Sequence, residues 1–511
     1  MALHIQTQSG VVEGATDANG IHSFKNVPFA SPPVGPLRLQ PPQPPESWEG
    51  ARPATAFGPV CIQAAMPGIF GELGTPQNPA GDACLNLNVW TPDPGATGLP
   101  VLFWIHGGAF YAGSGIDDVY DGSAFARDGV VAVTINYRLG VQGFWHLGDH
   151  FSELASSGNL GMLDQIAALE WVQANIAAFG GDPSKVTIAG ESAGGMSAGT
   201  LMAMPRAKGL FHRAIPQSGA GHNGISAPTA TMIAGHMLDM LGVKPGDTEA
   251  LARVPSDVML QTQIKLTDEL AVGRDPVRFG EAAASAMAFQ PTYGTELLPQ
   301  RPVDAIAAGS AADIGVMTGT TKEEALIFLV DLKDMFDPAS VEATMDLVFG
   351  MAGKSGAEAL ALYQGNRPGA EPHELIAALE TDRMFTVPAI RMADAQVANN
   401  SDVWLYRFDW GNPSRGGAFG AHHFSEVPFA FDMSTTPQAD AFFEGATALE
   451  LAAATHSAWV AFATNGNPNN PALPDWPRYE PTTRATMLFD EPCLVANRPA
   501  GDEIDLWAGV L

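Results

Sequence analysis

The chain has 511 residues, of which 46% are hydrophobic, so it can bury a large core and lacks the composition of a disordered protein. Its net charge is −29, because 55 acidic residues outnumber 26 lysines and arginines. This balance excludes nucleic acid as an expected partner, since a polyanion binds to a basic surface.

The sequence contains no signal that predicts insertion into a membrane. No apolar run reaches the roughly 18 residues of a membrane span. Residues 1–5 also lack the basic and apolar segments of a signal peptide. We therefore expect a cytoplasmic protein with no membrane span, and a secreted mature form is the alternative. Only three cysteines are present, which argues against a disulfide scaffold.

Proline-rich turns separate the short apolar runs of residues 5–60, which predicts edge strands and loops. Further along the chain, strand-like runs alternate with segments of helical spacing, which predicts a mainly parallel sheet. Several of these runs are almost wholly apolar, as in strands that are covered on both faces. Strands are expected at 85–90, 101–105, 130–135, 186–189, 314–318 and 403–408, and helices at 163–179, 196–203, 229–241, 372–381 and 449–464.

The domain organisation follows from this order of elements. The sequence shows no internal repeat and no composition shift that marks a linker. Residues 227–395 are richer in helix-like stretches than the rest of the chain. We expect one catalytic α/β domain over residues 1–511, with a helical insertion at roughly 227–395.

The first candidate for chemistry is Ser192, in the run Gly190-Glu191-Ser192-Ala193-Gly194. A Gly-x-Ser-x-Gly run carries meaning only where a strand enters it and a helix leaves it. The expected strand and helix at 186–189 and 196–203 meet that condition, and the helix dipole would favour negative charge beside Ser192. Taken alone, the motif is equally compatible with a serine that caps a helix behind a glycine-rich turn.

A second motif, residues 104–110, reads Trp-Ile-His-Gly-Gly-Ala-Phe and follows another expected strand. Its small residues allow backbone N–H groups to approach a ligand and to stabilise an oxyanion. The expected donors are Gly108, Ala109 and Ala193. An ordinary turn would explain this motif alone, but the two motifs together predict acyl transfer at Ser192.

Beyond these motifs, the sequence resembles the type-B carboxylesterase/lipase family, which includes bacterial p-nitrobenzyl esterases, animal carboxylesterases and cholinesterases. The resemblance implies the α/β-hydrolase fold, a mostly parallel twisted sheet flanked by helices. It is carried by blocks in the family's order at residues 23–30, 82–89, 136–138, 158–165, 179–183, 217–219 and 465–469.

The resemblance also implies the other members of a catalytic triad. The family's acid corresponds to Glu324 in the turn 321–325, where Ala325 departs from the family's glycine. The base corresponds to His423, three residues before an acidic residue, and His422 is the fallback. Without the resemblance, an acidic first helical turn would explain Glu324. The order Ser, Glu, His is the order that this fold uses.

Some structural contacts are implied by the resemblance alone. We expect two ion pairs, a hydrogen bond that supports the acid, and a loop that the family closes with a disulfide. A cytoplasmic location would keep the two cysteines of that loop reduced, so the sequence does not decide whether they form a disulfide. The pairs are Arg38 with Asp82, Arg138 with Asp164, Ser218 with Glu324, and Cys61 with Cys84.

The expected function is hydrolysis of uncharged carboxylic esters with short to medium acyl or aryl groups, through an acyl-enzyme. We expect no cofactor and no metal, because the histidine pair has no accompanying cluster of ligands. The expected partner is a small-molecule ester, and the chain is expected to be a monomer or homodimer. Residues 67–83 contain no tryptophan, which argues against a choline ester.

Three other functions are alternatives to this one. A non-catalytic, cholinesterase-like binding protein usually lacks a triad member, and no member is missing here. Epoxide and haloalkane hydrolases of the same fold use an Asp nucleophile, where this chain has Ser192. A lipase with a mobile lid is distinguished by faster hydrolysis at an oil–water interface.

Overall fold

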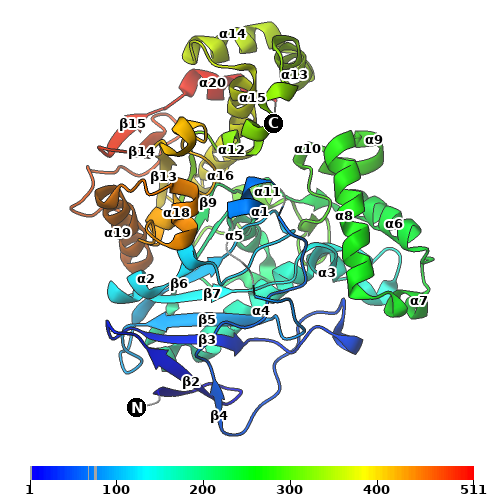
Figure 1. The fold of residues 1–511 in the computed structure, drawn as a ribbon, viewed down its shortest axis with the longest axis vertical. Coiled ribbons are helices and arrows are strands. Elements are labelled where there is room, and N and C mark those ends of the chain that lie inside the picture. Colours follow the sequence, from blue (N-terminus) through cyan, green and yellow to red (C-terminus); the bar gives the residue numbers. More distant parts are fainter. Residues whose placement is uncertain (1–2, 67, 74–77, 511) are drawn as a thin grey trace.

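A twisted sheet of thirteen strands runs through the part of the chain that the structure describes (Figure 1). The structure is a computed structural model that describes residues 3–66, 68–73 and 78–510. The expectation for residues 67–83 falls partly on residues 67 and 74–77, which lie outside the described residues. In spatial order the strands are β1 (Leu3–Gln6), β2 (Val11–Thr16), β3 (His22–Pro28), β5 (Asn86–Thr91), β7 (Val131–Ile135), β6 (Leu99–Ile105), β8 (Gly181–Glu191), β9 (Arg213–Gln217), β12 (Gly315–Thr321), β13 (Val403–Phe408), β14 (Ala485–Phe489) and β15 (Leu494–Asn497), with β4 (Ala51–Pro53) beside β2.

The centre of the sheet is parallel, as the alternation of strands and helices predicts. Every pairing from β7 to β14 in the spatial order is parallel. The pairings from β1 to β7 and between β14 and β15 are antiparallel. The predicted α/β-hydrolase fold is therefore confirmed. A separate pair of short parallel strands is formed by β10 (Ile225–Ser226) and β11 (Thr292–Tyr293).

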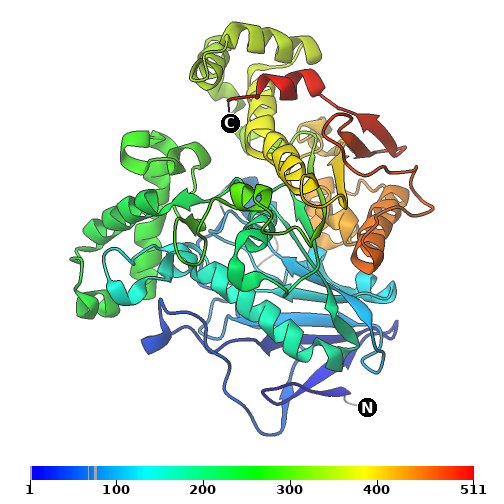
Figure 2. The same ribbon diagram turned by 180° about the vertical axis from the view of Figure 1, so that it is seen from behind.

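Helices cover both faces of the sheet (Figures 1 and 2). The helices that precede β12 in the chain are α1 (Ile69–Leu73), α2 (Ser123–Arg127), α3 (Gly140–Phe144), α4 (Leu160–Asn175), α5 (Ala193–Ala203), α6 (Ala227–Leu241), α7 (Thr248–Arg253), α8 (Ser256–Gly273), α9 (Pro276–Phe279), α10 (Ala282–Ser285) and α11 (Pro302–Ala307). The later helices are α12 (Leu326–Leu329), α13 (Pro338–Gly350), α14 (Gly356–Asn366), α15 (Pro372–Thr381), α16 (Val387–Val397), α17 (Val427–Ala430), α18 (Pro437–Phe443), α19 (Leu449–Asn465) and α20 (Gly501–Leu506).

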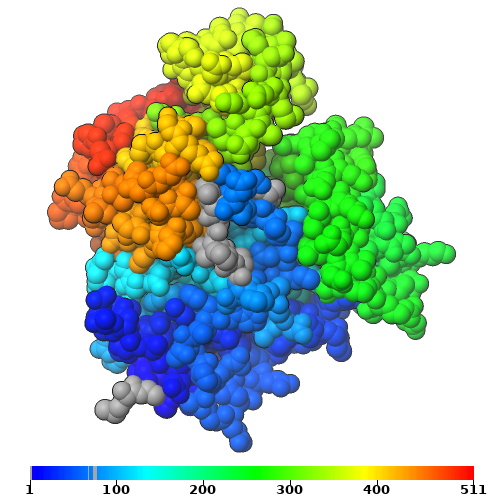
Figure 3. Space-filling model, viewed as in Figure 1, coloured from blue at the N-terminus to red at the C-terminus, as the bar shows by residue number. Residues whose placement is uncertain are grey.

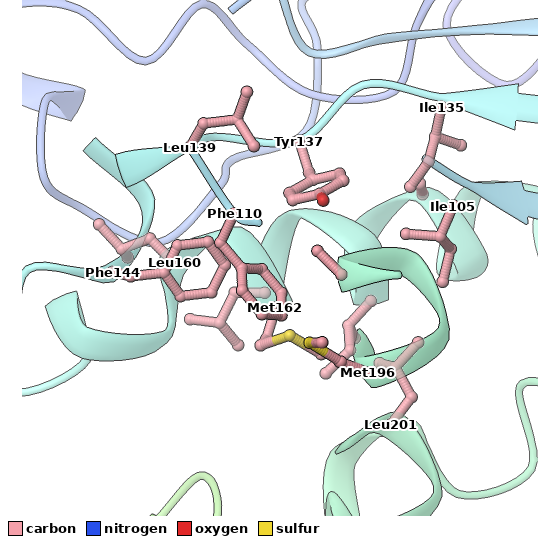
Figure 4. Packing of buried hydrophobic residues seen from close by; sticks show 14 of the residues in the cluster. Ile105, Phe110, Ile135, Tyr137, Leu139, Phe144, Leu160, Met162, Met196 and Leu201 are labelled. Carbon is pink, nitrogen blue, oxygen red and sulfur yellow. The ribbon is translucent and has the colours of Figure 1, made fainter. Parts of the chain in front are cut away.

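The apolar strands separate two hydrophobic cores, because successive side chains point to opposite faces of a sheet. Phe103 and Ile105 of β6 lie in the core that contains α4 and α5. Trp104, between them, lies in the other core, together with Trp459 of α19. Figure 4 shows part of the first core, where Ile105 lies beside Ile135 of β7, and Met196 of α5 belongs to the same core. Covering on both faces explains why these strands are almost wholly apolar.

Strand β12, expected from the sequence at 314–318, belongs to the central sheet and lies inside residues 227–395, so it divides this helix-rich region into two segments. The sequence pattern does not predict its neighbour in the sheet, β9. Strand β9 contains Pro216 yet pairs with neighbours on both sides. Proline usually indicates an edge strand because it lacks a backbone N–H. None of the described helices is long and apolar enough to cross a membrane.

One of the two expected ion pairs is confirmed. Arg138 forms a buried bidentate ion pair with Asp164, with N···O distances of 2.8 and 2.7 Å. The other expectation is wrong, because Arg38 donates to the carbonyl oxygens of Leu251 and Val254 at the end of α7 and makes no pair with Asp82. A guanidinium at this place adds hydrogen-bond donors for carbonyls at the C-terminal end of the helix.

The two cysteines expected to share a loop are neighbours in the structure. The Sγ atoms of Cys61 and Cys84 lie 2.8 Å apart, and both residues are buried free thiols. The structure therefore brings the two thiols together without joining them. Burial is the main cause that raises the pKa of the Cys61 thiol, and its contact with Cys84 adds to the effect.

Candidate active site

Ser192 lies at a sharp turn between the end of β8 and the start of α5. Its backbone has φ 56° and ψ −122°, which is strained for a residue with a side chain. The glycines beside it allow the turn to form: a Cβ atom on Gly194 would lie 1.9 Å from the carbonyl oxygen of Ile105. The strand, the turn and the helix are those that the Gly-x-Ser-x-Gly motif requires.

His423 and Glu324 lie in direct contact, although 99 positions separate them in the sequence. Glu324 follows β12, and His423 lies in the loop that precedes α17. Nδ1 of His423 is 2.5 Å from Oε2 of Glu324, and both side chains are buried. Oε1 of Glu324 accepts a hydrogen bond from the backbone N–H of Thr321 at 2.7 Å, which orients the carboxylate.

The neighbouring His422 lies in a different environment. It is fully buried, and its Nδ1 lies 2.7 Å from the carbonyl oxygen of His423. Its Nε2 is 3.3 Å from the amide of Asn412. Burial lowers the pKa of His422 to about 4. His422, the alternative candidate for the base, therefore bonds to Asn412 and to the backbone of His423 and not to Glu324, and its neutral ring packs within this loop.

Ser192 and His423 line the same cavity, which has a volume of about 640 Å³. Among the described residues, however, the Ser192 hydroxyl makes no hydrogen bond to His423. Nε2 of His423 lies 3.1 Å from Oε1 of Glu191, without the geometry of a hydrogen bond. Contacts between a nucleophile and its base are often loose when no substrate is bound.

The glycine-rich loop at residues 107–110 packs directly against the turn that carries Ser192. A Cβ atom on Gly107 would lie 3.1 Å from Cβ of Ser192. Gly108, Ala109 and Phe110 have positive φ values of 102°, 54° and 57°. The described hydrogen bonds leave the N–H groups of Gly108 and Ala109 unused, and the first N–H of α5 has no partner within the helix.

Two further carboxyl groups, those of Glu191 and Glu426, are buried close to Glu324. Oε1 of Glu426 accepts a hydrogen bond from Gln217 at 3.2 Å, and no lysine or arginine pairs with Glu191 or Glu426 among the described residues. Burial is the largest cause that raises the pKa of both groups, and their proximity to the other carboxylates adds to it. The sequence did not predict these two residues as site residues, although Glu191 precedes Ser192 in its motif and Glu426 is the acidic residue that follows His423.

We expect the buried Glu426 to make the stability of the fold depend on pH. Its pKa is raised to about 8, so the folded chain keeps a proton that an unfolded chain releases near pH 4. The stability that this proton contributes is present below about pH 4 and is lost as the pH rises through about 8. Glu426→Gln, which cannot ionise, is expected to raise the free energy of unfolding above pH 8 by on the order of 1–4 kcal/mol.

This expectation is measured by urea unfolding of both proteins over that pH range. Glu450→Gln, at an exposed position of α19, is the matched control. An equal decline of stability with pH in the wild type and in Glu426→Gln would show that the Glu426 proton does not contribute.

The cavity is lined by aromatic and small side chains. The aromatic residues come from α1, α12, α18 and the loop of His423, and they include Phe70, Phe328, Phe424 and Phe442. Figure 3 shows this face, where the blue segment with α1 lies between the orange segment with α18 and the green segment with α8. The lining therefore combines parts of the chain that are distant in the sequence.

The resemblance led us to expect that Ser218 supports Glu324. The Ser218 hydroxyl is buried but makes no hydrogen bond, so the expected bond to Glu324 is wrong. Its backbone N–H instead donates to the carbonyl oxygen of Gly319 at 2.9 Å. In the described part of the chain, no three His, Cys, Asp or Glu side chains are grouped to hold a metal ion.

Comparison with known proteins assigns the family. The sequence profile described as the carboxylesterase family matches residues 2–507. The para-nitrobenzyl esterase of Bacillus subtilis (strain 168) is 39% identical over 502 residues, which cover 98% of this chain and 97% of that protein. The phenmedipham hydrolase of Pseudarthrobacter oxydans is 35% identical over 497 residues, which cover 95% of this chain and 94% of that protein.

A solved structure gives the same result in three dimensions. The carboxylesterase of Geobacillus stearothermophilus at pH 6.2 matches with a TM-score of 0.85 and 37% identity, and the match covers 99% of each chain. The match of fold and sequence thus extends over almost the whole chain. The chain belongs to the carboxylesterase family, and it is a carboxylic ester hydrolase.

Proposed function

We propose that the protein hydrolyses uncharged carboxylic esters through an acyl-enzyme on Ser192, with His423 as base and Glu324 as acid of a catalytic triad. The observation that supports this most strongly is the 2.5 Å contact between His423 and Glu324 at the cavity that Ser192 lines. A carboxylate on Nδ1 leaves Nε2 free to accept a proton and stabilises the imidazolium that forms.

In the proposed reaction, Nε2 of His423 takes the proton of the Ser192 hydroxyl while Oγ attacks the ester carbonyl. The N–H groups of Gly108, Ala109 and Ala193 would stabilise the resulting oxyanion. The imidazolium then protonates the departing alcohol, and the acyl-enzyme remains. Water attacks the acyl group by the same proton transfers and frees Ser192.

The cavity supports the proposal that the substrate is uncharged and has a short to medium acyl or aryl group. Its aromatic lining suits an apolar group, and none of its described lining residues is a lysine or arginine that would pair with an anionic one. The B. subtilis relative is named for the para-nitrobenzyl group, which makes an uncharged aromatic ester.

A series of p-nitrophenyl esters from acetate to palmitate tests this proposal, with an organophosphate-treated sample as control. We expect hydrolysis of the short and medium esters, a decline for the longest ones, and full inhibition by the organophosphate. Absence of hydrolysis throughout the series would contradict the proposed substrate class. A sharp rise in rate when the ester forms an emulsion would instead favour a lipase.

A further inference from the structure

A π-helical turn lies directly behind His423. Residues Asp382–Thr386 form this turn between α15 and α16. A π-helical turn holds an extra residue and is frequent at functional sites. The hydroxyl of Thr381, just before the turn, accepts the backbone N–H of Ala325 at 3.0 Å, next to Glu324. Within the turn, the ring of Phe385 lies 4.9 Å from the imidazole of His423. One short segment therefore contacts His423 and the residue that follows Glu324.

Phe385 differs from the other aromatic residues around the imidazole. Phe328 also contacts His423, at 5.3 Å, but it is 44% exposed and lines the cavity. Phe385 is 4% exposed and does not line the cavity. Its ring therefore contacts the imidazole from the protein side, where it would not touch a substrate.

The π-helical turn is anchored on its other side by buried hydrogen bonds. The hydroxyl of Tyr363 donates to Oδ2 of Asp382 at 2.5 Å and accepts from Nε1 of Trp507 at 3.1 Å. All three residues are buried, and burial raises the pKa of Asp382 to about 7. The turn is thus fixed to α14 and to the residue that follows α20.

We propose that Phe385 is a positioning residue that sets the orientation of the His423 imidazole, an inference that rests on the function proposed above. The hydrogen bond to Glu324 fixes Nδ1 but still allows the ring to tilt about that contact. Nε2 now lies 3.1 Å from Glu191, so a modest tilt decides whether it faces Glu191 or the hydroxyl of Ser192. The flat ring of Phe385 restricts this tilt because it packs against the imidazole.

The test compares Phe385→Leu with Phe179→Leu, a matched control in which another buried phenylalanine with a ring contact of 4.9 Å is shortened far from the site. We expect Phe385→Leu to lower kcat for p-nitrophenyl butyrate by about 10–100-fold, because small displacements of catalytic groups cost rates of this order. KM should stay within about twofold. Phe179→Leu should lower the unfolding temperature and leave kcat within about twofold.

A spectroscopic measurement complements the kinetics. The proton between His423 and Glu324 should give a downfield proton NMR signal in the wild type and in Phe179→Leu, and a shifted or broadened signal in Phe385→Leu. An unchanged kcat and signal in folded Phe385→Leu, or a loss that lies in KM alone, would overturn the proposal. If the leucine variant does not fold, Phe385→Met is measured by the same criteria.

The outcome is separate from that of the proposed function. If the wild type hydrolyses the ester and the Ser192→Ala variant does not, the proposed function holds whatever Phe385 does. If the Ser192→Ala variant keeps full activity, the proposed function fails, and the positioning role fails with it.

Discussion

Replacing Ser192 with alanine is expected to lower kcat for p-nitrophenyl esters by about 10⁴–10⁶-fold, as in other hydrolases with a serine triad. The change removes one oxygen atom at a turn whose backbone is already set by Gly190 and Gly194, so the fold should persist. KM should change little, since the cavity keeps its lining. Steady-state kinetics and a thermal unfolding curve measure both effects.

Ser197→Ala is a matched control on the same helix. Ser197 lies on α5, is buried, and accepts a hydrogen bond from Gln165 at 3.1 Å. Its replacement should cost on the order of 1 kcal/mol of stability and leave kcat within about twofold. Retention of more than about a tenth of the wild-type kcat by Ser192→Ala would exclude Ser192 as the nucleophile.

The second large effect is expected for Glu324→Gln. Glutamine has the same shape as glutamate but lacks the charge that stabilises the imidazolium, and it can hold the histidine in the wrong tautomer. Replacing the acid of a triad by its amide lowers kcat by about 10⁴-fold in a comparable enzyme. We expect a loss of this order, because Glu324 is fully buried and its Oε2 lies 2.5 Å from His423.

Glu323→Gln, at the adjacent position, is the control for this variant. The Oε2 atom of Glu323 accepts the backbone N–H of Ala421 at 2.7 Å, and a glutamine can keep that bond through its carbonyl oxygen. Its kcat should stay within about threefold of the wild type, as expected for a residue that makes no contact with the reacting groups. Equal losses in the two variants would show that the whole turn, and not Glu324, is required.

The strands and helices that surround the site could be predicted because their patterns are local. Buried parallel strands are almost wholly apolar, as β6, β7 and residues 186–189 of β8 are, and the glycines around Ser192 signal the tight turn. Strand β9 could not be predicted in this way, because Pro216 argues against a central strand. Its pairing depends on β8 and β12, which only the folded chain brings to its two sides.

The candidate site could be predicted only in part. The sequence alone does not distinguish Glu324 from Glu323 or His423 from His422, and the resemblance to a family was needed to choose between them. The buried position of Glu191 and Glu426 depends on long-range packing. The partners of Arg38 also depend on long-range packing, because its guanidinium donates to carbonyls at the end of α7, more than 200 residues away in the sequence. The π-helical turn with Phe385 has no local sequence pattern that predicts it.

The most direct test of the central claim is to locate the adduct of an organophosphate after it has inactivated the protein. Peptide mass spectrometry should find a single phosphorylated residue, Ser192, and the extent of labelling should match the loss of ester hydrolysis. The Glu324→Gln variant should react far more slowly, because its histidine is a poorer base. An adduct at another residue, or complete inactivation without an adduct on Ser192, would contradict the account.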